Sequence, residues 1–128
     1  METNQEMTVL VIKPNEHPVV KRISNELESL QHEVDGYIEC IYPFDDMVAL
    51  ICNEEGKNQG HQLNRGLYDE DDKLYDIIAG TFLIVGLGEE DFCSLTEEQI
   101  EKFRDMFYNP EIFLSIEGKL VGLKYSIE

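Results

Sequence analysis

The sequence predicts an α+β fold: a mostly antiparallel sheet with two packed helices and a C-terminal β-hairpin. Several apolar, β-branched runs are short and are joined by short turns, as antiparallel strands are. Two other segments carry apolar residues at helical spacing. The last part of the chain holds two apolar runs around a Glu117-Gly118-Lys119 turn, which indicates the hairpin.

The first half of the chain predicts three strands and one helix. Residues 8–12 are a β-branched run that ends before a proline, and they predict the first strand. Residues 37–42 and 47–52 predict two further strands in an antiparallel hairpin, the second central because it is apolar on both faces. A helix is predicted near residues 18–31 from an apolar stripe at spacings of four, four and three residues: Val19, Ile23, Leu27 and Leu30.

The middle of the chain predicts a loop and then a buried strand. Residues 53–73 are the longest polar segment, and a long ordered loop in a small domain is often functional. The apolar stretch that follows is broken at Gly80. We expect a short strand or turn over residues 75–80 and a buried strand over residues 81–86.

The C-terminal third predicts a capped helix and the hairpin. Thr96 and Gln99 have the spacing of a capping box, which predicts a helix that runs to about Tyr108. Residues 112–116 and 120–127 are the two strands expected in the hairpin.

The length of 128 residues predicts one domain with a substantial core. We expect a flexible tail over residues 1–6 and a single α+β domain over 7–128, in which residues 7–108 are the main body and 109–128 the hairpin. The apolar sides of the expected elements should be buried together: Val9, Val11, Ile23, Leu27, Leu50, Phe82, Ile84, Ile100 and Phe103.

The charge excludes two classes of partner. The chain has 27 acidic and 10 basic residues, a net charge of −17. Such a surface repels phosphate backbones and anionic lipids, so we expect no direct binding of nucleic acid or membranes. The N-terminus is acidic and the three cysteines are widely spaced, which predicts a cytoplasmic protein with reduced thiols.

Motifs for catalysis and metal binding are missing from the sequence. It has no phosphate loop of the GxxxxGK type, no GxSxG and no HExxH. The three histidines are far apart, and the run Asp69–Asp72 lacks the spacing of a calcium loop. We therefore expect no metal, no cofactor and no enzymatic activity.

A polar constellation on the long loop and its flanks is a candidate ligand site. Arg65 would hold a small anionic ligand, and Asp76 would orient the guanidinium through a charge-assisted hydrogen bond. The alternative is that these groups only satisfy the loop backbone. The candidate residues are Asn53, Glu55, Gly56, Asn64, Arg65, Asp76 and Thr81.

Three acidic runs are a candidate interaction surface. Carboxylates spread over one face can approximate the charge array of duplex DNA, although acidity also serves solubility alone. The residues are Asp69, Glu70, Asp71, Asp72, Glu89, Glu90, Asp91, Glu97, Glu98 and Glu101.

The candidate ligand residues lie in segments with a family resemblance. The runs Asn53-Glu54-Glu55-Gly56-Lys57, Leu63-Asn64-Arg65 and residues 76–86 resemble the Domain of Unknown Function 3846 family, over about Thr8 to Phe107. The resemblance implies a small protein of bacteria, phages or mobile elements. It implies no established activity and therefore no catalytic residues, and the terminal hairpin lies outside it.

Two functions remain open at this point. In one, the acidic surface imitates DNA and blocks a basic host protein such as a nuclease or restriction complex. In the other, the polar constellation binds or sequesters a small anionic, nucleotide-like signal. The terminal hairpin also offers an edge strand through which a homodimer could form.

Overall fold

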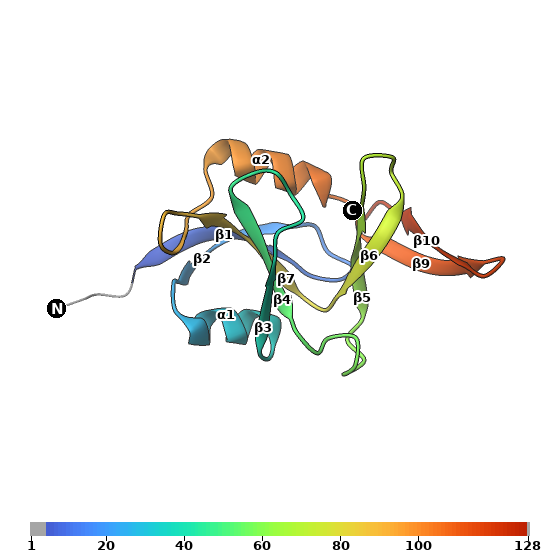
Figure 1. Cartoon of the computed structure of the whole chain (residues 1–128), viewed down its shortest axis with the longest axis horizontal. Coiled ribbons are helices and arrows are strands. Elements are labelled where there is room, and N and C mark those ends of the chain that lie inside the picture. The colour runs from blue at the N-terminus through green and yellow to red at the C-terminus, as the bar shows by residue number, and fades with distance from the viewer. Residues whose placement is uncertain (1–4, 128) are drawn as a thin grey trace.

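The computed structural model describes residues 5–127, which form ten strands and two helices (Figure 1). The strands are β1 (Glu6–Ile12), β2 (Val19–Ser24), β3 (Ile38–Ile41), β4 (Val48–Asn53), β5 (Leu63–Tyr68), β6 (Leu74–Ala79), β7 (Phe82–Leu87), β8 (Phe92–Cys93), β9 (Glu111–Ile116) and β10 (Lys119–Lys124). The helices are α1 (Leu27–Val34) and α2 (Glu97–Met106). The predicted α+β class is confirmed.

The main sheet has the strand order β2-β1-β7-β4-β3, with β8 paired to β7. Its strand pairs are antiparallel, and so are the two separate two-stranded sheets, β5–β6 and β9–β10. Helix α1 lies on one side of the main sheet and α2 on the other (Figure 1). Neither helix among the described residues is long and apolar enough to cross a membrane.

The sheet separates two hydrophobic clusters, because successive side chains of a strand point to opposite faces. On the α2 side, Leu50, Phe82 and Ile84 pack with Phe103. On the α1 side, Val9, Val11 and Ile23 pack with Leu30 and Val34. The prediction of a single core was therefore wrong, although most of its members are buried. Ile100 is partly buried against the α2-side cluster, and Leu27 is 57% exposed.

The predicted helix over residues 18–31 was wrong in its first half, where β2 runs antiparallel to β1. Residues 19 and 20 are β-branched valines that favour an extended chain and follow a proline. Ile23 is buried from this strand and Leu30 from α1. The four apolar residues at helical spacing thus belong to a strand, β2, and a helix, α1, rather than to one helix.

The predicted tail over residues 1–6 falls mostly on residues 1–4, which lie outside the described residues. Glu6 is not tail, because it begins β1 and pairs with Ser24. The next backbone bond, from the Asn25 N–H to the Gln5 carbonyl, is 2.8 Å long. Pairing with β2 therefore extends the first strand toward the N-terminus.

The predicted loop over residues 53–73 was wrong between residues 63 and 68, where β5 pairs with β6. Polar residues and a glycine interrupt the apolar alternation of β5, so its sequence does not read as a strand. Three other predicted features of the chain are confirmed. Strands β3 and β4 form the expected antiparallel pair, Thr96 and Gln99 form the capping box of α2, and β9 and β10 form the terminal hairpin.

Candidate functional site

Arg65 lies in β5 and is fully buried. A guanidinium has five N–H donors, and this one makes five hydrogen bonds. Its Nε and Nη2 donate to the Phe107 carbonyl at 3.1 and 2.9 Å, and Nη2 also donates to the Glu16 carbonyl at 2.6 Å. Its Nη1 donates to the Lys13 carbonyl at 3.4 Å and to Asn64 Oδ1 at 2.7 Å. Every donor is therefore used inside the protein, and the prediction that Arg65 anchors a ligand was wrong.

The burial of Arg65 serves to join distant parts of the chain. Its backbone acceptors lie on the link between β1 and β2 and just after α2, more than 40 residues away in both directions. Burial lowers the pKa of Arg65, while the nearby Glu111 acts in the opposite direction. The guanidinium is held by carbonyl dipoles, which accept its hydrogen bonds without adding a charge.

Asn64 and Asn53 hold the backbone in the same manner. The Asn64 amide donates to the Ile12 carbonyl at 2.9 Å and to the Gly80 carbonyl at 2.8 Å, so it joins β1 to the turn before β7. The Asn53 amide donates to the Val34 and Asp35 carbonyls at 3.1 and 3.0 Å, which fixes the end of β4 to the end of α1. Both asparagines are buried and have structural partners.

The prediction that Asp76 orients Arg65 was wrong, because Asp76 has other partners. Its Oδ1 accepts from Lys57 Nζ at 2.9 Å and from the Ile77 N–H at 2.8 Å. This ion pair is half-exposed, so it contributes little to stability. The expected pairing failed because Arg65 already has its full set of carbonyl acceptors.

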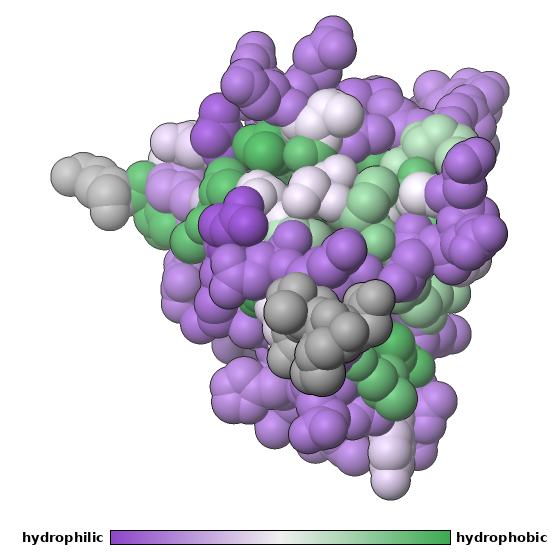
Figure 2. Space-filling model, turned by 90° about the vertical axis from the view of Figure 1, so that its left-hand side faces the viewer, coloured by the Kyte–Doolittle hydropathy of each residue, from purple (hydrophilic) through white to green (hydrophobic). Residues whose placement is uncertain are grey.

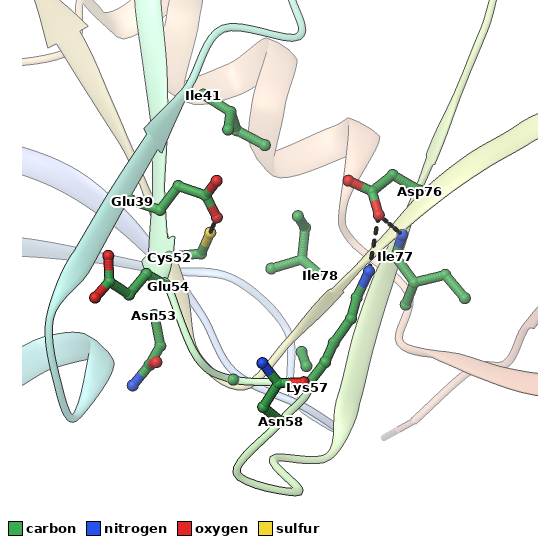
Figure 3. Close-up of a pocket in the computed structure, with 12 residues that line it drawn as sticks. Glu39, Ile41, Cys52, Asn53, Glu54, Lys57, Asn58, Asp76, Ile77 and Ile78 are labelled. Carbon is green, nitrogen blue, oxygen red and sulfur yellow. Dashed lines mark hydrogen bonds and ion pairs between the residues drawn. The ribbon is translucent and has the colours of Figure 1, made fainter.

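A cavity of about 240 Å³ lies between β3, β4 and β6 and the segment after β4 (Figure 3). Three of the predicted ligand residues, Asn53, Gly56 and Asp76, line this cavity. The other four, Glu55, Asn64, Arg65 and Thr81, are not among its lining residues. The sequence thus located one edge of the cavity and one of its charged groups, Asp76, but not Glu39, Glu54 or Lys57.

The charges in this cavity oppose an anionic ligand. Glu39, Glu54 and Asp76 supply carboxylates, and Lys57, the one lysine of the lining, is paired with Asp76. Figure 3 shows Glu39 and Cys52 side by side across the cavity from the Lys57–Asp76 pair. Alternation along β3 and β4 could have indicated that Glu39 faces Cys52, since the two residues are opposite each other in the register.

Cys52 is not set up as a nucleophile. Burial, and to a smaller extent the Glu39 carboxylate, raises the pKa of the thiol to about 12. The thiol donates to Glu39 Oε1 at 3.9 Å. It is therefore protonated at neutral pH, and only thiolates react readily.

Sequence analysis missed Glu111, a carboxylate that is 5% exposed at the start of β9. Its Oε1 accepts from the Gly66 N–H at 3.0 Å and its Oε2 from the Tyr68 hydroxyl at 2.5 Å. Burial and this hydrogen bond raise the pKa of Tyr68. An acidic residue that opens an apolar strand was the available signal, but 27 acidic residues hid it.

The ten residues of the predicted acidic surface are all exposed. They lie in the β5–β6 turn, the β7–β8 turn and the first half of α2. The β5–β6 turn rises to the level of α2 at the right of Figure 1, and the β7–β8 turn lies at the left end of the sheet, near the start of α2. Figure 2 shows that hydrophilic residues cover most of that left end.

Within residues 5–127, no group of three or more His, Cys, Asp or Glu side chains is placed to hold a metal ion. The three thiols are free: Cys52 is buried, Cys40 partly buried and Cys93 exposed.

The comparison with curated proteins and the comparison with solved structures found no match. The scan against family models matched residues 7–108, which contain the main sheet, both helices and the buried Asn64–Arg65 pair and exclude the β9–β10 hairpin. Since this match spans most of the chain, the chain belongs to the family described as domain of unknown function (DUF3846).

Proposed function

We propose that this is a small, non-enzymatic protein of phage or mobile-element type that inhibits a host defence system. Its acidic surface would imitate DNA and occupy the basic nucleic-acid-binding site of a nuclease or restriction complex. The observation that supports this most is the placement of ten exposed carboxylates on α2 and the two turns near it.

The physical reason is electrostatic. Duplex DNA carries about one negative charge per 1.7 Å of its axis, and proteins that bind it present a complementary array of lysines and arginines. Carboxylates held on a helix and two turns can meet such an array without base pairs or phosphates. Attraction of this kind speeds association and weakens with salt.

The alternative of a small anionic ligand has less support. Arg65 has no free donor, and the cavity beside Asn53, Gly56 and Asp76 carries more carboxylates than cations. Anions are repelled from such a cavity. A cytoplasmic location follows from the proposed function, because host nucleases act there.

The test is DNA cleavage by purified defence enzymes, a restriction complex and an RNA-guided nuclease, titrated with the protein. We expect inhibition that weakens steeply between about 50 and 200 mM salt. A variant with Glu97, Glu98 and Glu101 changed to Gln should inhibit less.

The matched control changes three exposed carboxylates near α1: Glu26→Gln, Glu28→Gln and Asp35→Asn. Both triple variants alter the net charge by the same amount, so only the location differs. Equal loss of inhibition in both would show that bulk charge, rather than the α2 side, is responsible. Full inhibition by the α2 variant would overturn the proposal.

A homodimer stays a prediction that concerns the hairpin. Ile112, Leu114, Ile116 and Leu123 are each between 44% and 49% exposed, and the register places them on one face of β9–β10. Leu114→Glu should abolish a dimer seen by light scattering, whereas Ser115→Glu on the opposite face should not. A monomeric wild-type protein would contradict the prediction.

A further inference from the structure

A second cavity, of about 270 Å³, lies at the C-terminal end of α2. Its walls come from the β3–β4 link, the β5–β6 hairpin, the end of α2 and the β9–β10 hairpin. Four of the lining residues are aromatic: Phe44, Tyr68, Tyr75 and Phe107. Asp69 and Asp72 line it as well, and both belong to the acidic surface. The cavity is therefore continuous with the surface that carries the proposed function.

The buried carboxylate of Glu111 also lines this cavity. It accepts one hydrogen bond on each oxygen, and a carboxylate can accept about four. In the described part of the chain, no lysine or arginine nitrogen forms an ion pair with it. Lys124 lies directly opposite Glu111 in the β9–β10 register and lines the same cavity, but its ammonium forms no ion pair with Glu111. The N–H groups of Arg65 are all bonded elsewhere.

Aromatic walls beside a carboxylate suit a flat cation. The π faces of tyrosine and phenylalanine attract ammonium and guanidinium groups, and arginine also stacks on such rings. A guanidinium can at the same time donate two parallel hydrogen bonds to a carboxylate. A neutral urea group can donate hydrogen bonds to the carboxylate, but it lacks the charge that the rings and the carboxylate attract, and an anionic group is repelled.

We propose that this cavity receives one arginine side chain of the basic partner. The inference rests on the proposed function, since it names the anchor by which a basic protein is held on the acidic surface. The guanidinium lies against Tyr68 and Tyr75 and is directed toward Glu111, and Asp69 and Asp72 attract it at the rim.

The test uses N-acetyl-arginine methylamide as the probe, titrated into the ¹⁵N-labelled full chain. The neutral isostere N-acetyl-citrulline methylamide is the matched ligand control. We expect saturable shifts of the Gly66 amide, which is bonded to Glu111, with the arginine probe only. Equal shifts with citrulline, or none at Gly66, would overturn the proposal.

Two variants test the walls and the carboxylate separately. Tyr75→Ala should weaken arginine binding about two- to fivefold, the usual size of one cation–π contact, while Tyr37→Ala on a distant exposed tyrosine should not. Tyr75 is 56% exposed, so its loss leaves the fold intact. Glu111→Gln keeps an acceptor for Gly66 and should remove the preference for arginine over citrulline. Unchanged binding by Tyr75→Ala would sink the proposal even if Glu111→Gln fails to fold.

These results are separable from those of the cleavage assay. Arginine binding without enzyme inhibition would support the cavity and count against DNA mimicry. Inhibition of cleavage that Tyr75→Ala does not change would support DNA mimicry and refute the proposal that the cavity holds an arginine of the partner.

Discussion

Two polar regions of this protein use charge in opposite ways. The buried polar cluster, which we define as Asn64, Arg65 and Glu111, lies around β5 and has its hydrogen bonds inside the chain. The acidic surface presents its carboxylates to water. Buried polar groups are costly to leave unpaired, whereas exposed ones are cheap to change. The comparison indicates that Asn64 and Arg65 hold the fold together, and that binding of a partner is to be sought at the surface and in the cavity that opens from it.

The largest expected effect is that of Arg65→Met, which keeps the apolar stem and removes the donors. The buried Phe107 carbonyl and the part-buried Glu16 and Lys13 carbonyls lose this donor. An unsatisfied buried acceptor costs about 1–3 kcal/mol, and one that water reaches costs less. We expect the free energy of unfolding to fall by about 4 kcal/mol in urea.

The control for this variant is Arg22→Met, because Arg22 is exposed and makes one surface ion pair with Glu6. Its loss should cost less than about 1 kcal/mol. Similar costs for the two arginines would contradict the division into a buried cluster and a surface.

Asn64→Ala should have the next largest effect. The substitution removes one donor from each of the Ile12 and Gly80 carbonyls and one acceptor from Arg65. We expect a loss of about 2–3 kcal/mol in the same urea measurement. Asn58→Ala, whose exposed amide makes one 3.3 Å bond to Glu55, should be close to neutral. A neutral Asn64→Ala would show that β5 does not depend on this amide.

The fold could be predicted in part because some signals are local. The capping box of Thr96 and Gln99 lies within one turn, and the apolar run of β4 lies within one strand. The stripe from Val19 to Leu30 is also local, but it coincides with helical periodicity only because a strand and a helix follow each other closely. Periodicity alone does not separate these two cases.

The roles of the candidate residues could be predicted less well, because the partners are distant in sequence. Arg65 donates to carbonyls 42, 49 and 52 positions away, and backbone carbonyls leave no trace in a sequence. The acidic runs, in contrast, were located correctly as exposed because carboxylates are rarely buried unless paired. Glu111 is the exception that a count of acidic residues cannot reveal.

The cysteines also differ between the buried part of the molecule, which holds Cys52, and its surface, which holds Cys93. The folded state raises the pKa of Cys52 from an ordinary value of 9.0 to about 12, chiefly by burial. Because the folded state favours the neutral thiol, this contribution to stability is present below pH 9 and is lost between about pH 9 and 12.

At pH 7.5 an aromatic disulfide reagent should modify the exposed Cys93 quickly and Cys52 only as fast as the protein unfolds. A Cys40→Ser, Cys93→Ser double variant, which keeps only Cys52, would contradict this if it still reacted quickly.

The smallest expected effect concerns the acidic surface, and it has the opposite sign. Glu70, Glu89 and Glu90 make no side-chain hydrogen bond or ion pair among the described residues, so changing all three to Gln removes charge and nothing else. A chain with a net charge of −17 repels itself in the compact state. At low salt the triple variant should therefore be more stable than wild type, by about 0.5 kcal/mol or less, the range typical of surface substitutions. Above about 0.5 M salt the difference should vanish, because the screening length is then well below the spacing of these turns. Urea unfolding of both proteins at two salt concentrations measures it, and a loss of stability that persists at high salt would mean that these carboxylates are part of the folded structure rather than of a surface free to bind a partner.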